Sequence, residues 1–491
     1  DTQRRMRCRW ALVALLGLAA CSGGGDNINT VPTLAWGNFR HDSTNGAVGI
    51  GIARNEGQAT LILPATLGST ISTPAVDNDG NVFLGTPTGL VSLNDRGDLR
   101  WTVTTCQPPG GTAVPLGPIS SSPTVTPGRN IVVASAASGT TPGRVFAFEE
   151  KNDGTVECLW AFLPPGPPAS IRSSPQVQLD SLDLSLLSVF IGTGGGALQA
   201  INGIGTPRWT YTVGTDPRSV TSSPAVDPTG PFYFTTPDGI LAATDASGRP
   251  FWQFPIGVPP VRDLQASPAV GTSVYAIGGG SAVYAFNPGG SPKWPAFQPQ
   301  ADIFGSPAFA AQSIDVGSDL LLDTIVYLVD VNGLLYGVRD TNGQLWDIQR
   351  CSLDPLESCR TDSCAPDLGT CVNRRCTGDT SESCTPDTCI ASNAGECVSQ
   401  PALIPVTDGA VTVETSPAVS GDLFVIVGTT DGRLCARGLD GTVPGDDDDA
   451  SNPWIDGCIA LGDGEPVRSS PAIGPNGRMF ITTNSGLYKI E

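Results

Sequence analysis

Eight copies of a short Ser/Thr-Pro motif recur along this 491-residue chain, and their spacing constrains the fold more than any other feature. In each copy the proline is followed by a small or polar residue and then by an apolar one. The eight prolines are Pro74, Pro123, Pro175, Pro224, Pro268, Pro307, Pro417 and Pro471. Six of the seven intervals span 39 to 54 residues, the length of a four-stranded repeat, and the seventh spans 110 residues and contains an insertion.

Each repeat continues in the same order after its proline. A turn leads to a dense apolar run such as residues 82–86 or 424–429, and a glycine turn leads to a third apolar run. A second glycine turn then leads to a tryptophan. These are hairpin signals, and four antiparallel strands in succession form a meander. With 60 glycines and 43 prolines, helix bundles and coiled coils are excluded.

The number of tryptophans gives a second estimate of the number of repeats. Seven repeats carry one each, and these are Trp101, Trp160, Trp209, Trp252, Trp294, Trp346 and Trp454. The eighth repeat begins at Pro471 and reaches Glu491 with three strands and no tryptophan. We expect the segment Leu34–Phe39, which contains Trp36, to supply the missing fourth strand. The sequence therefore predicts an all-β, eight-bladed propeller of four-stranded antiparallel blades over residues 34–491, closed into a ring by its N-terminal strand.

This order of motifs resembles the repeat of pyrroloquinoline-quinone-type (PQQ-like) β-propellers. In that family the tryptophan docks between adjacent blades. The resemblance thus implies a structural, blade-docking role for Trp36, Trp101, Trp160 and Trp209, and for the tryptophans of the later repeats.

The N-terminal residues have the pattern of an exported lipoprotein. Two arginines follow Met6, residues 10–20 are apolar, and Leu18-Ala19-Ala20 precedes Cys21. The apolar run is too short to span a bilayer. We expect a signal peptide over residues 1–20 that starts at Met6, a lipidated Cys21, and a flexible tether over residues 21–33. An ordinary signal peptide with an incidental cysteine is the alternative. The resemblance to bacterial lipoproteins implies an outer-membrane lipoprotein of the cell envelope.

An insertion over residues 351–400 carries eight cysteines in polar sequence. Such a segment cannot form an apolar core, so we expect disulfides to hold it. Zinc is the weaker alternative, because the insertion has no histidine and no Cys-x-x-Cys pair. Outside it, Cys435 and Cys458 fall on neighbouring antiparallel strands, and Cys106 pairs with Cys158 by elimination. The insertion is either a partner-binding projection or an expanded loop.

The charge balance excludes several function classes. The formal net charge is −20, which disfavours nucleic-acid binding. His41 is the only histidine, so a Ser-His-Asp triad or a multi-histidine metal site is not expected. The acidic run at residues 446–449 lacks the residue spacing of a calcium-binding loop, so we interpret it as a solvated turn. We expect no catalytic residue, no metal site and no cofactor.

The PQQ-like resemblance raises one enzyme alternative, a PQQ- and calcium-dependent quinoprotein dehydrogenase. Those enzymes carry a disulfide between adjacent cysteines, an acid–amide calcium site and an aspartate base. This chain has no Cys-Cys dipeptide, and each tryptophan is assigned to a blade. The chain more closely resembles the BamB family, which implies a non-catalytic scaffold, attached to the membrane only through its lipid, that binds a protein partner such as the β-barrel assembly machinery. A surface-exposed adhesion lipoprotein is the other alternative.

Overall fold

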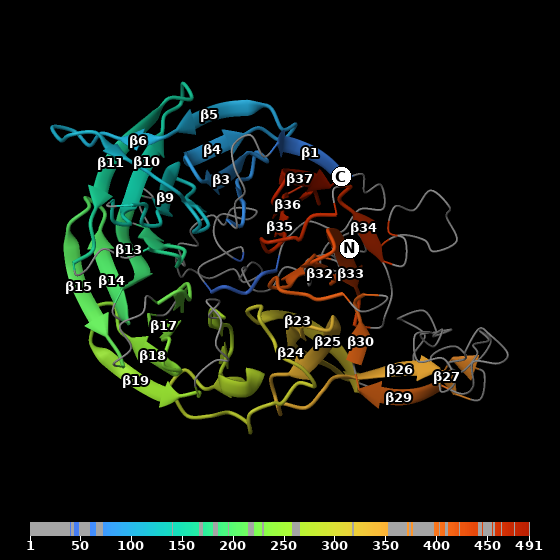
Figure 1. Cartoon of the computed structure of the whole chain (residues 1–491). Coiled ribbons are helices and arrows are strands. Elements are labelled where there is room, and N and C mark those ends of the chain that lie inside the picture. Colours follow the sequence, from blue (N-terminus) through green and yellow to red (C-terminus); the bar gives the residue numbers. More distant parts are fainter. Residues whose placement is uncertain are drawn as a thin grey trace, which may run out of the picture.

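Eight small antiparallel sheets stand around a common axis in the computed structural model of the chain (Figure 1). The structure describes residues 40, 44–48, 59–64, 72–139, 141–165, 170–179, 185–194, 196–214, 220–227, 230–257, 266–316, 319–351, 371–372, 375–376, 397–401, 403–407, 411–421, 423–439, 444, 454, 457–462, 464–475 and 477–490. The predicted eight-bladed propeller is confirmed.

The blades follow the chain, and in each the first strand begins at a Ser/Thr-Pro motif. Blade 1 contains β2 (Ala75–Val76), β3 (Val82–Thr86), β4 (Gly89–Leu93) and β5 (Leu99–Val103). Blade 2 contains β8 (Thr124–Val125), β9 (Asn130–Ala134), β10 (Val145–Glu150) and β11 (Val156–Phe162). Blade 3 contains β12 (Gln176–Leu179), β13 (Leu186–Thr193), β14 (Ala197–Asn202) and β15 (Pro207–Thr212). Blade 4 contains β16 (Ala225–Val226), β17 (Phe232–Thr235), β18 (Ile240–Thr244) and β19 (Pro250–Pro255).

The second half of the ring is less regular. Blade 5 contains β20 (Ala269–Val270), β21 (Val274–Ile277) and β22 (Val283–Phe286). Blade 6 contains β23 (Ala308–Val316), β24 (Asp319–Val329), β25 (Leu334–Arg339) and β30 (Leu403–Pro405). Blade 7 contains β31 (Ala418–Val419), β32 (Val425–Gly428), β33 (Arg433–Arg437) and β34 (Cys458–Ala460). Blade 8 contains β35 (Ala472–Ile473), β36 (Met479–Thr483), β37 (Gly486–Ile490) and β1 (Ala59–Pro64).

The core lies between the blades. In blade 1 every residue of β3 and β4 is buried, whereas β5 at the outer edge is half-buried or exposed along its length. Sheets covered on both faces carry continuous apolar runs instead of alternating polar and apolar residues. This explains why the second and third strands of each repeat are so uniformly apolar.

The N-terminal part of the chain closes the ring, but through a different strand from the predicted one. β1 (Ala59–Pro64) pairs antiparallel with β37, and Figure 1 shows the two side by side. The prediction that Leu34–Phe39 supplies this strand is wrong, because β1 occupies the position. The side chain of Ile62 covers Gly97 of blade 1, where later blades use a tryptophan. An aliphatic residue therefore fills the closing interface, and Trp36 lies outside the described residues.

Blade 5 departs from the four-stranded prediction. Its sheet has three strands, and the segment that carries Trp294 makes only isolated bridges, from Phe297 to Val283 and from Pro292 to Phe286. Pro292 and Pro295 flank the tryptophan, and neither has an N–H group to donate to β22. The missing donors explain why no regular fourth strand forms here.

The insertion leaves the ring from blade 6. The segment after β25 first pairs with it, since the Trp346 amide donates to the Gly337 carbonyl at 2.7 Å. The chain then departs through β26 (Asp347–Cys351), returns through β29 (Cys397–Pro401), and completes the blade with β30. β27 (Cys371–Val372) and β28 (Arg375–Cys376) pair at its far end. The insertion therefore interrupts the outermost strand of blade 6. We call its four strands, β26 paired with β29 and β27 paired with β28, the arm.

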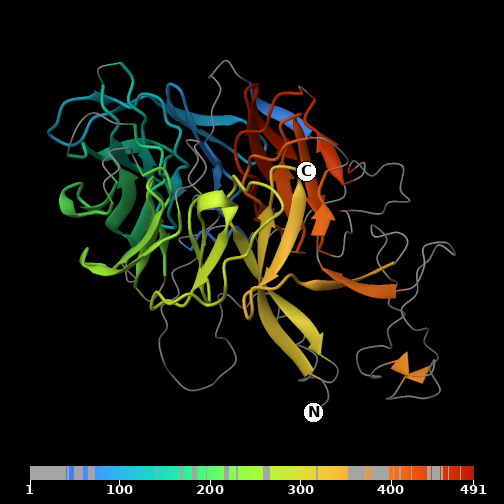
Figure 2. The ribbon, with the colours of Figure 1, turned by 60° about the horizontal axis from the view of Figure 1, so that its bottom comes forward.

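Blade 6 also projects through its first hairpin. β23 and β24 pair over nine residue pairs, from Ala308 with Tyr327 to Val316 with Asp319. Figure 2 shows this hairpin extending beyond the body of the ring, and the arm extending away from it on the same blade. Both large projections in the described part of the molecule thus belong to one blade.

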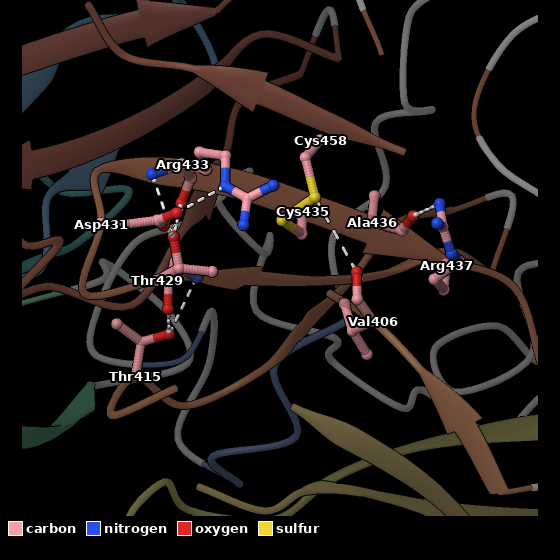
Figure 3. Close-up of a disulfide and its surroundings, with 10 residues drawn as sticks. Val406, Thr415, Thr429, Asp431, Arg433, Cys435, Ala436, Arg437 and Cys458 are labelled. Carbon is pink, nitrogen blue, oxygen red and sulfur yellow. Dashed lines mark hydrogen bonds and ion pairs between the residues drawn. A yellow bond between two sulfur atoms is a disulfide. The ribbon is translucent and has the colours of Figure 1, made fainter. Parts of the chain in front are cut away.

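Two disulfides lie in the described residues, and both were expected. Cys106, in the short strand β6 (Thr105–Cys106) that pairs with β7 (Val114–Pro115), is bonded to Cys158 of β11 and links blades 1 and 2. Cys435 and Cys458 are register partners of β33 and β34 and are bonded within blade 7 (Figure 3). Disulfides persist in oxidising compartments, so both bonds indicate an extracytoplasmic protein.

The helical content of the described residues is one short 3₁₀ turn, η2 (Gly279–Ser281), in blade 5. No helix in these residues has the length and apolar character needed to cross a membrane.

Candidate functional site

The hydroxyl groups of the eight Ser/Thr-Pro motifs form a closed ring around the axis. Each hydroxyl oxygen accepts a hydrogen bond from the backbone N–H of the equivalent residue in the preceding blade, at 2.8–3.3 Å. The circuit closes where the Ser470 amide donates to Thr73 Oγ1. We call these side chains the ring hydroxyls, and they belong to Thr73, Ser122, Ser174, Ser223, Ser267, Ser306, Ser416 and Ser470. The serine of the motif thus joins blade to blade.

Removing one ring hydroxyl should weaken the ring measurably. Ser267→Ala leaves the buried Ser223 amide without its acceptor, and an unpaired buried donor costs about 1–3 kcal/mol. We expect the free energy of unfolding, measured by urea denaturation, to fall by about 1–2 kcal/mol. Ser247→Ala removes an exposed turn hydroxyl bonded to Asp245 and serves as the control, with little expected change. Equal effects of the two substitutions would contradict the role of the ring.

Residues 40 and 44–48 occupy the axis on one side of this ring, and we call them the plug. Backbone groups tie the plug to three blades: Val270 N–H donates to the Thr44 carbonyl, Phe309 N–H to that of Gly46, and Val419 N–H to that of Ala47. The Asn45 side chain donates to the carbonyls of Ser223, Pro224 and Pro268, and accepts from Gln176 Nε2 at 3.1 Å. The plug therefore lies at the axis and is bonded to the inner ends of blades 3 to 7.

Arg40 is the most unusual residue of the plug, because its guanidinium is fully buried. It donates to the carbonyls of Asn45, Ser306 and Pro307. No carboxylate of the described residues pairs with it, and burial lowers the pKa of Arg40 to about 9. The side chain still carries its positive charge at neutral pH. A buried positive charge thus lies directly beneath the ring hydroxyls.

On the opposite side of the ring from the plug is the axial cavity, of about 230 Å³. The ring hydroxyls line it, together with residues two positions before them in the sequence. These are Ser120, Arg172, Thr221, Phe304, Glu414 and Arg468. Residues two apart on an extended chain point the same way, which explains why both sets face the axis. Arg468 Nη1 and Glu414 Oε2 form an ion pair at 3.3 Å at the wall of the cavity.

The cavity does not suit the quinone and calcium of the dehydrogenase alternative. Among its described lining residues Glu414 is the one carboxylate, and it is already paired with Arg468. Phe304 is the one aromatic residue, and no amide side chain lines the cavity there. The described part of the chain also contains no group of three or more His, Cys, Asp or Glu residues placed to hold a metal ion. The calcium ligands and stacking partner of a quinoprotein are not found in the described lining.

Three of the tryptophans lie against a turn of the following blade in the same way. The indole N–H groups of Trp160, Trp209 and Trp252 donate to the carbonyls of Gly203, Ala246 and Pro288, at 2.8–3.0 Å. Two residues after each of these carbonyls is a glycine with positive φ, and a Cβ on that glycine would lie 2.5 Å from the indole. Trp294 approaches Gly343 of blade 6 similarly.

Trp101 differs from these. Its indole N–H donates to Glu150 Oε2 at 3.3 Å, and its ring packs against Phe83 at a centroid distance of 5.9 Å. The equivalent glycine of blade 2, Gly154, has no described atom near its Cβ position. A cleft of about 420 Å³ opens between blades 1 and 2, with the ion-paired Arg100 and Glu150 in its wall.

Several predicted features lie outside the described residues. These are the lipidation site Cys21, Trp36, His41 and the acidic run 446–449.

Sequence reasoning missed the plug and the cavity wall. Arg172, Glu414 and Arg468 are far apart in the chain and have no motif of their own. Their common position, two residues before a motif serine, is the signal that could have identified them.

A family model described as outer membrane protein assembly factor BamB matches residues 54–232 and 187–347, more than half of the chain. No curated protein matches the sequence. Among solved structures, BamB from Moraxella catarrhalis is 18 % identical with a TM-score of 0.39, over 76 % of this chain and 82 % of that chain. A europium-containing methanol dehydrogenase is 12 % identical with a TM-score of 0.44, over 92 % and 90 %. The family match runs from β1 to the start of the arm.

Proposed function

The chain belongs to the family of the outer membrane protein assembly factor BamB, and we propose that it is a non-catalytic scaffold that binds a protein partner in the cell envelope. The process we propose is β-barrel assembly in the outer membrane, which the description of the family supports. A lipid on Cys21 would attach the scaffold to the membrane.

The projection of blade 6 is the observation that carries the proposal. The arm and the β23–β24 hairpin extend from a single blade of an otherwise compact ring (Figures 1 and 2). Rings of buried blades offer a partner mainly loops and outer edges, whereas a projecting pair of strands offers backbone and side chains together. We therefore assign partner binding to blade 6.

The test is crosslinking in intact envelopes, with and without the insertion. A variant lacking residues 352–396 keeps Cys351 and Cys397, which are register partners in the arm, and removes the six cysteines between them. The intact chain should yield a defined crosslinked partner from the barrel-assembly machinery, and the variant should lose it. A matched variant that keeps the arm but carries Phe251→Ser on the exposed edge of blade 4 should retain the crosslink.

Three outcomes would contradict the proposal. A crosslink that is still formed after removal of residues 352–396 would show that the partner binds outside the insertion. Recovery of extracellular host or matrix proteins alone would favour an adhesion lipoprotein. Alcohol- or sugar-dependent reduction of an artificial electron acceptor, after reconstitution with pyrroloquinoline quinone and calcium, would favour a dehydrogenase.

A further inference from the structure

We propose that the cleft between blades 1 and 2 binds a tryptophan side chain of a partner protein, on the turn of blade 2 that contains Gly154. This contact lies outside blade 6, and the inference does not depend on the role assigned to the arm. It rests on three tryptophan contacts within this same chain, on the length of one hairpin, and on the residues that line the cleft.

Three other turns of the ring show how an indole is bound. Trp160, Trp209 and Trp252 each lie on a turn of the following blade. In each case the indole covers a glycine with positive φ and donates to the carbonyl two residues before that glycine. All three glycines are partly covered. The chain thus contains three copies of one binding arrangement between a tryptophan and a turn.

The turn of blade 2 has the same backbone conformation. The Gly154 N–H donates to the Lys151 carbonyl at 3.0 Å, as the Gly205 N–H donates to the Asn202 carbonyl at 2.9 Å in blade 3. The two glycines have φ values of +83° and +82°. Gly154 is exposed, however, and no described atom lies within 4 Å of its Cβ position. The turn therefore presents to the cleft the surface on which the other turns bind an indole.

The length of the blade 2 hairpin explains why Trp101 does not cover this turn. Gly154 precedes Trp160 by six residues, whereas the turn glycine of blade 3 precedes its tryptophan by four. β10 and β11 therefore continue for two more residue pairs, and the turn lies about 7 Å further along the strands. Two residues restore the same face of a strand, so the turn still faces blade 1. Trp101 meets Glu150 instead, with Nε1 at 3.3 Å from Oε2.

The lining of the cleft suits an aromatic side chain. The cleft has a volume of about 420 Å³, within the range of ligand pockets, and Phe83, Asn152 and Gly154 line it. Asn152 carries the carbonyl that corresponds to the indole acceptors of the other turns. The ion pair of Arg100 and Glu150 lies in the same wall. An apolar surface beside polar, charge-paired groups is the usual setting of an aromatic anchor at a protein interface.

A partner protein fits this cleft better than a part of the same chain. Trp101 is held by Glu150 and by packing against Phe83, and the turn lies beyond it. A second copy of the chain is also a poorer candidate, because three of its outer tryptophans already lie on turns of their own ring. The fitting occupant is a tryptophan on an edge strand or loop of another protein, with its N–H directed at the Asn152 carbonyl.

Saturation-transfer NMR of N-acetyltryptophanamide with the full chain tests the proposal. We expect saturable binding of this compound, none of N-acetylalaninamide, and severalfold weaker binding of N-acetyl-1-methyltryptophanamide, which lacks the N–H donor. Gly154→Asn should weaken binding at least tenfold, because asparagine tolerates positive φ and its side chain would lie where the indole binds. Gly462→Asn, at an open turn after β34 with a φ of +90°, is the matched control and should bind like the unaltered chain.

Four results would overturn the proposal. The first two are no saturable signal from the tryptophan amide with folded protein, and equal binding by Gly154→Asn and Gly462→Asn. The third is equal binding of the 1-methyl compound, which would contradict donation to the Asn152 carbonyl. The fourth is a dimer of the intact chain that Gly154→Asn abolishes, measured by sedimentation, since it would assign the cleft to a second copy. A crystal with the amide bound on the Gly154 turn would support the proposal.

Discussion

Asn45→Ala should lower the free energy of unfolding by about 3–5 kcal/mol, one of the two largest effects expected of a single substitution in the ring. The Asn45 amide joins the inner ends of blades 3, 4 and 5, through Gln176, the carbonyls of Ser223 and Pro224, and that of Pro268. Removing it takes one hydrogen-bond partner from each of these buried groups. Asn45 also has a φ of +58°, which asparagine adopts more readily than alanine.

Asn45→Gly separates the two contributions. Glycine adopts positive φ without strain but makes none of the side-chain hydrogen bonds. We expect Asn45→Gly to recover only about 1 kcal/mol of the loss caused by Asn45→Ala, since the hydrogen bonds dominate. Urea unfolding followed by tryptophan fluorescence measures both variants. A loss below about 1 kcal/mol for Asn45→Ala would show that the plug does not hold the blades together.

The repeat made most of the fold predictable from sequence. Blade number follows from the Ser/Thr-Pro motif, because the same interactions recur in every copy, and eight weak signals reinforce one another. The two described disulfides were predictable for a related reason: once the strands are assigned, Cys435 and Cys458 fall on neighbouring strands. The sequence showed the motif serine only as the residue before the proline. Its hydrogen bond from the preceding blade is apparent only in the assembled ring.

The parts that occur once were not predictable in the same way. The closing strand was placed at Leu34–Phe39 because Trp36 completed the tryptophan count, yet Ile62 of β1 packs against Gly97 instead. The plug has no sequence period, and its partners lie more than 130 residues away, as with Asn45 and Gln176. Nothing local in the sequence indicates that Arg40 is buried, because an isolated arginine is usually exposed.

The axial cavity combines both situations. Its ring hydroxyls are periodic and could be counted from sequence, whereas its charge comes from Arg172, Glu414 and Arg468. The same position holds Ser120, Thr221 and Phe304 in three other blades. The blades repeat, but the side chains two residues before the ring hydroxyls differ from blade to blade. These side chains give the axis its varied chemistry, and only the assembled ring brings them together.

Gly205→Ala should destabilise the ring by about 3 kcal/mol, whereas Gly154→Ala should cost only about 1 kcal/mol. The two glycines occupy the same turn of successive blades and have nearly equal φ, +82° and +83°, so the backbone strain of an alanine is the same at both. At Gly205 a Cβ would lie 2.5 Å from Cγ of Trp160, while at Gly154 it would meet no described atom within 4 Å. The difference therefore measures the contact between tryptophan and glycine alone.

The matched tryptophans provide the reciprocal test. Trp160 is nearly buried and donates to Gly203, so Trp160→Ala should cost about 3–5 kcal/mol as a buried-aromatic deletion. Trp101 is half-buried beside an open cleft, so Trp101→Ala should cost less. Urea denaturation of the four variants measures these differences. If Gly205→Ala and Gly154→Ala were equally destabilising, the tryptophan would not join adjacent blades through this turn, and the motif would have to be explained by packing within its own blade.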